Sequence, residues 1–317
     1  ALIDSEYECP IASTGFAVLR PSAELVPEFL YRWVQHPEFV GSLSSLVQGA
    51  LYPAVTESQV REQTIPLPPL ARQREIVARL DAQLAAAARA RTAVAAQLAE
   101  AERLESAFIE EALANVADAK VPLGGLLAAP LRTGLSKPTL PDSPYRCLTL
   151  AAVRKGLLIL DESKPVEMTA EEAKRHTVRP DAFYIVRGNG NRSLVGRGAL
   201  PPADASSYPA FPDLLFEVRP DHARLDRNYL RWVWDSRFVR EQIESAAATA
   251  AGIYKINQKN LSAITLPLPP LYVQTAVAGA LSRRCGHVAA LRTRLAARLA
   301  ELDRLPAALL RTAFADP

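Results

Sequence analysis

The chain has few residues of the types that build disulfide frameworks, metal sites and membrane spans. Its 317 residues include three cysteines and four histidines, and the cysteines lie far apart. No Cys or His pair accompanies them, which argues against a disulfide framework or a zinc site and favours a reducing compartment. Arginine or proline interrupts every apolar stretch before the roughly 20 residues that a membrane helix needs. With no signal peptide, we expect a cytoplasmic protein that does not contact a membrane.

The motifs of enzymes are also absent. The histidines have no partner at metal or catalytic-triad spacing, and there is no HExxH, nucleophile-elbow or phosphate-loop motif. The glycines between Arg187 and Gly198 lack the GxGxxG spacing of a dinucleotide loop and do not open a helix. No Asn-Pro-Pro-Tyr methyltransferase motif occurs. The sequence therefore predicts a protein without catalytic residues, metal ligands or a directly bound cofactor.

Charge is distributed unevenly along the chain. The net charge is −5 over residues 1–70, −1 over 71–120, +5 over 121–270 and +4 over 271–317. Because 49% of the residues are hydrophobic, the chain is expected to form packed cores rather than disordered segments. The excess of basic residues places any polyanion-binding surface in the second half.

A short proline-rich segment occurs twice and is the strongest pattern in the chain. The copies start at residues 65 and 266, so they are 201 residues apart. They read Ile-Pro-Leu-Pro-Pro-Leu and Leu-Pro-Leu-Pro-Pro-Leu, and Gln73 and Gln274 follow at the same distance. Three prolines remove backbone donors and hold the chain extended. Two copies in the same context indicate a duplication.

The duplication begins upstream of the prolines. Residues 16–21 end in Arg-Pro, as do residues 216–220, and each run is predicted to be a strand. A helix is expected to begin at Pro27. Its sequence over residues 30–34 recurs at 229–233.

Two long helices are expected to follow the proline-rich segments, from Gln73 to about Ala114 and from Val273 to about Ala313. Sustained 4-3 spacing of apolar residues favours helices that pair with each other. Ordinary amphipathic helices docked on globular cores are the alternative. Pro306 should kink or weaken the second helix. The predicted interface comprises Leu80, Leu84, Val94, Leu98, Val288, Leu291, Leu295 and Leu302.

Residues 121–270 read as an α+β domain. Short β-prone runs such as 147–150 and 157–160 alternate with turn signals, and Phe183–Val186 is a clear strand candidate. A second strand-like run, Leu194–Val195, follows it. Helical periodicity returns at residues 225–245.

Three basic loops of this domain are candidates for DNA contact. The loop from Arg187 to Arg197 holds three arginines, two asparagines and a serine without any acid. Arginine and asparagine make bidentate contacts to guanine and adenine, and arginine and serine also bind phosphate. Alternatively, this loop is a solvated hairpin tip. The candidate contacts are Arg132, Lys137, Arg187, Asn189, Asn191, Arg192, Ser193, Arg197, Tyr254, Lys255, Asn257 and Lys259.

The third loop, residues 132–137, carries the weakest signal of the three. In the loop at 252–260, Asn257 also fits the N-cap of a helix. That structural role and a contact with DNA can coexist.

These features resemble the DNA specificity subunit of type I restriction–modification enzymes. The repeated proline-rich segment with its glutamine, entering a long helix, is similar to the conserved regions of that family. Residues 184–197 and 254–257 are similar to its target recognition domains. The resemblance implies that each recognition domain reads half of a split site in double-stranded DNA, with the two helices packed antiparallel as a spacer. It also implies partner methyltransferase subunits that use S-adenosylmethionine, and a restriction or translocase subunit that uses ATP and Mg²⁺.

The resemblance also predicts the domain organisation. The chain is expected to be an N-terminally truncated member that lacks the early part of its first recognition domain, and self-association of the shortened chain stays open. The expected parts are the end of a first recognition domain (1–70), a central conserved helix (71–120), a complete second recognition domain (121–270) and a C-terminal conserved helix (271–317).

A coiled-coil adaptor that presents α+β modules to protein partners is the alternative function. Binding to duplex DNA separates the two functions, because a DNA-reading protein should bind duplex with steep salt dependence.

Overall fold

The computed structural model describes residues 1–3, 11–13, 15–47, 54–114, 116, 119–250 and 252–315. The chain forms two compact units, one of residues 1–101 with 291–317 and the other of residues 102–290. Helices α4 (Leu70–Leu113) and α9 (Leu271–Ala315) each contribute to both units. Their observed bounds confirm the two long helices predicted from the sequence.

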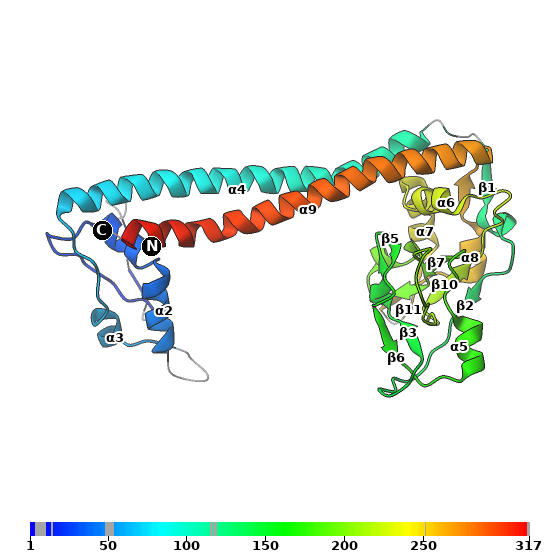
Figure 1. Ribbon diagram of the computed structural model, residues 1–317, viewed down its shortest axis with the longest axis horizontal. Coiled ribbons are helices and arrows are strands. Elements are labelled where there is room, and N and C mark those ends of the chain that lie inside the picture. Colours follow the sequence, from blue (N-terminus) through cyan, green and yellow to red (C-terminus); the bar gives the residue numbers. More distant parts are fainter. Residues whose placement is uncertain are drawn as a thin grey trace. The chain divides into compact units, whose positions relative to one another are not determined.

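Helices form the first unit. Short helices α1 (Pro27–Trp33), α2 (Pro37–Ser45) and α3 (Glu57–Arg61) precede α4. Prolines begin α1 and α2 at a position where no backbone N–H is needed. The core of this unit joins α1, the start of α4 and the end of α9, which Figure 1 shows in blue, cyan and red. Its largest members are Phe29, Trp33, Ile76, Leu80, Leu310 and Phe314.

The strand predicted at residues 16–21 is not formed. In the second unit the corresponding segment is β10 (Leu215–Val218), which pairs with a strand on each side. Among the residues of the first unit that the structure describes, no strand forms that could pair with residues 16–21. A β-strand needs a neighbour to satisfy its backbone groups, so this run stays irregular.

A six-stranded sheet organises the second unit, as Figure 1 shows in green. All of its pairings are antiparallel except the parallel pair of β5 and β9. In spatial order its strands are β2 (Arg132–Thr133), β10, β7 (Phe183–Val186), β9 (Gly198–Leu200), β5 (Gly156–Leu158) and β4 (Val153–Arg154).

Both faces of the central strands are covered. Phe183 and Ile185 of β7 pack in the core with α6 (Arg227–Trp234) and α7 (Arg237–Ala246), whereas Tyr184 and Val186 pack in a second core on the opposite face. A strand covered on both faces is apolar throughout, which explains why Phe183–Val186 was predicted correctly. The single helical stretch expected at 225–245 is instead two helices, because the chain leaves the helix at Asp235 and a serine cap at Ser236 starts α7.

Smaller elements complete the unit. Strand β1 (Lys120–Pro122) pairs with β13 (Thr265–Pro267), so the start and the end of the domain lie together. The others are the pair β3 (Arg146–Leu148) and β6 (Ser163–Pro165), the sheet of β11 (Ala248–Ala250), β12 (Ile253–Lys255) and β8 (Gly188–Asn189), and helices α5 (Ala170–His176) and α8 (Gln258–Ala263).

The structure confirms the duplication. Helices α1, α2, α3 and α4 recur in the same order as α6, α7, α8 and α9, and corresponding helices start 200, 200, 201 and 201 residues apart. The ends of the long helices correspond as well. Phe108 and Ile109 of α4 pack in the second unit, and Leu309 and Leu310, which are 201 residues later, pack in the first.

The two repeated glutamines make the same hydrogen bonds. The Gln73 side chain is fully buried, and its Oε1 accepts from Val26 N at 2.8 Å. Its Nε2 donates to the carbonyl oxygens of Glu24 and Pro68, both at 2.8 Å. We call this set a glutamine bridge, because it joins the N-cap of α1 to the proline-rich segment and to α4.

Gln274 forms the second glutamine bridge. It is also fully buried, and its Oε1 accepts from the N–H of Asp226, the N-cap of α6, at 2.8 Å. Its Nε2 donates to the carbonyl oxygens of Arg224 and Pro269, both at 2.9 Å. Each copy therefore binds a helix hairpin to the long helix through one amide side chain.

Contacts within each unit show that α4 and α9 run antiparallel. In the first unit Ile76 of α4 packs in one core with Leu310 of α9, and 15 residues later along α4 Arg91 Nε lies 2.6 Å from Oδ1 of the earlier Asp303. In the second unit Arg284 Nη2 lies 2.7 Å from Glu111 Oε2. Among the predicted interface residues, Leu80, Val288 and Leu302 are buried, and Leu84, Val94, Leu98 and Leu295 are half-buried. Leu291 differs from the expectation, since this residue is 44% exposed. Pro306 does not end α9, which continues to Ala315.

We predict that Gln73→Met or Gln274→Met lowers the free energy of unfolding of its unit by about 2–4 kcal/mol, because each leaves buried backbone groups unpaired. Denaturant unfolding followed by circular dichroism measures the change. Gln97→Met is the matched control, since Gln97 is exposed on α4. Equal stability of the Gln274 and Gln97 variants would contradict the role of the bridge.

Candidate nucleic-acid interface

Two of the predicted loops form one surface. Strand β8 lies in the loop of residues 187–197, which we call the recognition loop, and β12 lies in the loop at 252–260. The two strands pair antiparallel, with Asn189 opposite Tyr254 and Gly188 opposite Lys255. The amide N–H of Ile256 donates to Arg187 O at 2.9 Å. The structure thus brings together candidates that are more than 50 residues apart in the sequence.

The asparagines of the recognition loop shape its turns. Asn189 Oδ1 accepts from Asn191 N at 2.9 Å, and Asn191 Oδ1 accepts from Ser193 N at 3.0 Å. A 3₁₀ turn over Arg192–Leu194 follows, so the second strand begins at Gly198 rather than at the predicted Leu194. Bidentate adenine contact needs both the oxygen and the nitrogen of an amide. An amide oxygen has two lone pairs, so Asn189 Oδ1 can accept a second bond, whereas Asn191 Oδ1 already accepts from both the N–H and the hydroxyl of Ser193.

Arginines of the recognition loop bind it to the helices beneath. Arg192 Nη2 donates to Glu244 O at 2.7 Å. Arg197 Nη1 lies 3.2 Å from Asp235 Oδ1, and its Nε donates to Ser193 O at 3.0 Å. Burial raises the pKa of the Asp235 carboxyl, and the nearby charge of Arg197 opposes that shift. Arg187 is half-buried, with its guanidinium 5.8 Å from the centre of the Phe216 ring.

Exposed lysines stand beside these turns. Lys255 and Lys259 are both exposed, and Tyr254 is half-buried. Gly188 leaves room for the stem of Lys255, because a Cβ at that position would lie 3.0 Å from Lys255 Cγ. Asn257 caps α8 by accepting from Asn260 N at 2.7 Å, as the structural alternative predicted. This surface offers flexible cations for phosphates.

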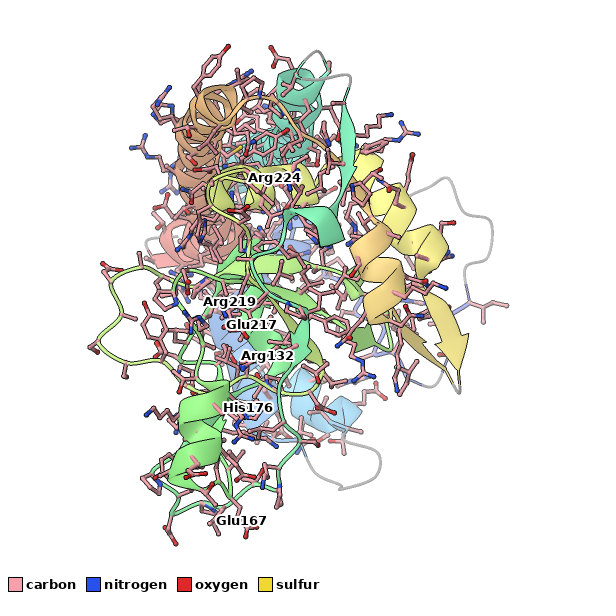
Figure 2. The ribbon with its side chains drawn as sticks, turned by 90° about the vertical axis from the view of Figure 1, so that its right-hand side faces the viewer. Arg132, Glu167, His176, Glu217, Arg219 and Arg224 are labelled. Atoms are coloured by element: carbon pink, nitrogen blue, oxygen red, sulfur yellow. The ribbon has the colours of Figure 1, made fainter. Side chains whose placement is uncertain are left out.

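The third loop is joined to the domain by ion pairs. Arg132 Nε lies 2.7 Å from Glu217 Oε2, whose side chain is 1% exposed, and Lys137 Nζ lies 2.7 Å from Glu172 Oε1. Figure 2 shows Arg132 next to Glu217, with Arg219 and His176 on the same face. Gln258 Nε2 donates to Leu131 O at 3.3 Å, so the start of this loop lies beside α8. Arg132 is therefore the partner of a buried carboxylate.

Sequence reasoning missed the charged residues that support these loops. Glu217 has a visible signal, since it interrupts the apolar run of β10. Asp235 and Arg240 have none, because their positions on a helix pattern resemble any solvated face. Within the described ranges, no three His, Cys, Asp or Glu side chains lie close enough together to hold a metal ion. No helix there has the length and apolarity to span a bilayer.

Comparison with known proteins now places the chain. Residues 1–93 match the family model of the type I restriction modification DNA specificity domain. The type I restriction enzyme StySPI specificity subunit of Salmonella potsdam is 22% identical over 324 residues, spanning 97% of this chain and 69% of the relative. The EcoKI specificity subunit of Escherichia coli K12 is also 22% identical, with the same coverage.

Solved structures agree with the sequence relatives. A chain from a structure of a type I R-M system, described with its complex assembly and conformational transition, is 26% identical with a TM-score of 0.74, covering 95% of this chain and 74% of that one. This chain is similar to the type I specificity subunits over nearly its whole length. The HsdS subunit of Thermoanaerobacter tengcongensis shares the fold, with 24% identity, a TM-score of 0.53 and coverage of 91% and 70%.

Arg132→Met should lower the free energy of unfolding by about 3 kcal/mol, because Glu217 is left buried without its cation. Arg132→Met combined with Glu217→Met should recover most of that loss, since an apolar pair replaces an ion pair at little cost. Thermal unfolding of the two variants measures both the loss of stability and its recovery. If Arg132→Met leaves stability unchanged, Arg132 is free for other contacts and this structural assignment is wrong.

Proposed function

We propose that this chain is a non-catalytic subunit that recognises DNA sequence and acts as a scaffold in a type I restriction–modification complex. The observation that carries the proposal is the pairing of β8 with β12, which joins two basic loops into one surface on a domain attached to α9. The relatives are named as specificity subunits, which supports the same role.

The division of labour follows from the arrangement. Residues 121–270 act as a complete target recognition domain, with DNA contacts drawn from the recognition loop and from Tyr254, Lys255, Asn257 and Lys259. Residues 1–70 correspond to the end of a first such domain. Residues 71–120 and 271–317 form the conserved helices, whose packing sets the distance between recognition sites.

In this proposal partner subunits, and not this chain, catalyse the reactions. Methyltransferase subunits bind the conserved helices and supply S-adenosylmethionine chemistry, and a restriction subunit adds ATP- and Mg²⁺-dependent cleavage. The chain itself positions them relative to DNA in the cytoplasm. The duplicated glutamine bridges support this, because they give the two ends of the scaffold the same local structure.

Salt-dependent binding tests the proposal against a protein adaptor. We expect the chain to bind random-sequence duplex with affinity that falls steeply with salt, by a slope of about 0.9 per phosphate bound. Lys255→Ala with Lys259→Ala should reduce the slope by about 2, because each lysine that no longer binds a phosphate releases about one counterion fewer. Fluorescence anisotropy over a salt series measures the slope.

Lys174→Ala is the control for that measurement, since Lys174 is also exposed but lies on α5. The same slope in the double variant and in the wild type would show that this surface does not bind the phosphates of DNA. An absence of duplex binding would favour the adaptor.

A further inference from the structure

Arg240 is a buried cation that reaches from α7 into the recognition loop. Its side chain is only 9% exposed. Its Nη2 donates to the carbonyl oxygens of Ser193, at 3.3 Å, and Val195, at 3.1 Å. Arg197 Nε donates to the same Ser193 oxygen, and Trp234 Nε1 donates to Gly196 O at 2.7 Å. Helices α6 and α7 thus hold three successive parts of the loop from below.

Stability does not explain an arginine at this place. Its Nε and Nη1 are buried and have no hydrogen-bond partner within the described structure, and its ion pair with Glu244 spans 3.5 Å. Burial lowers the pKa of the guanidinium, with Arg197 adding to the effect. An apolar side chain of similar length would avoid burying these two unpaired nitrogens, and it would lose only the bonds that Arg240 makes to the loop and the attraction to its nearby carboxylates. The residue therefore serves the loop rather than the core.

The first copy of the repeat gives an internal comparison. It has the same helix hairpin and the same glutamine bridge, as described above. The position that corresponds to Arg240 lies 199 or 200 residues earlier, at Gly41 or Val40. Neither can donate a side-chain hydrogen bond, and Val40 is 49% exposed. The arginine is therefore present in the second copy, whose described residues include the recognition loop.

We propose that Arg240 is a positioning residue for sequence reading: it fixes the recognition loop to the α6–α7 hairpin, which Gln274 in turn binds to α9. The register of the loop on DNA is thereby set relative to the helix that carries the rest of the scaffold. This inference rests on the proposed function. It adds a residue that touches no DNA itself and acts through the carbonyl oxygens of Ser193 and Val195.

The test compares Arg240→Met with Arg237→Met in the full chain. Arg237 lies on the same helix but is exposed, and it pairs with Glu241 on that helix. Duplexes are first selected by the wild-type chain from a randomised pool and sequenced. Affinity is then measured for the selected duplex and for a scrambled duplex. Hydrogen–deuterium exchange of residues 192–197 is measured without DNA.

Measured well below its melting temperature, Arg240→Met should keep the wild-type affinity for the scrambled duplex, whereas its preference for the selected duplex falls by about tenfold. Amide exchange over residues 192–197 should accelerate, with no change in α8. Arg237→Met should match the wild type in every measurement. Unchanged preference and exchange in Arg240→Met, or an equal loss in Arg237→Met, would overturn the inference.

Two further outcomes keep the proposals distinguishable. If the wild type selects no preferred sequence, the proposed function fails, and amide exchange alone then decides whether Arg240 orders the loop. If Arg240→Met does not fold, Arg240→Lys takes its place in every measurement. Lysine keeps the charge but has a shorter side chain without the planar fork of the guanidinium, so this variant should still show reduced preference if Arg240 acts through the loop.

Discussion

The hydrogen bonds of a buried glutamine amide are the constraint on which the rest of the structure depends. An extended proline-rich segment has few backbone donors of its own, so a side chain must hold it against the domain. Gln73 and Gln274 each do so with one acceptor and two donated bonds, and each also satisfies the N-cap of a neighbouring helix. A long helix therefore leaves each domain in a defined direction, which a flexible linker would not provide.

The fixed geometry of the candidate nucleic-acid interface also depends on these hydrogen bonds. In the second unit Gln274 fixes the start of α6, and Trp234 and Arg240 of the α6–α7 hairpin fix the recognition loop by its carbonyl oxygens. The strand pair β8–β12 then places the lysines of the second loop beside it. The buried charges in this series are costly in a small domain. Their presence is understandable if the domain must present one fixed surface to a partner with regular geometry.

Repetition and periodicity made much of the fold predictable from the sequence. The proline-rich segments located both long helices within a few residues, and the apolar run Phe183–Val186 located the central strand. The strand at 16–21 was wrong because its pattern cannot reveal whether a partner strand exists. The pairing of the two basic loops could not be predicted, because strand pairing between distant residues leaves no mark in a single sequence. For the same reason Arg240 was missed, since its role depends on carbonyl oxygens that lie about 45 residues earlier.

The most direct test of the account is a map of amide protection when a random-sequence duplex is added to the full chain at low salt. The account predicts slower hydrogen–deuterium exchange at residues 187–197 and 253–259, with α5 unchanged. Protection confined to α5 and the β3–β6 pair, or no protection at all, would contradict it.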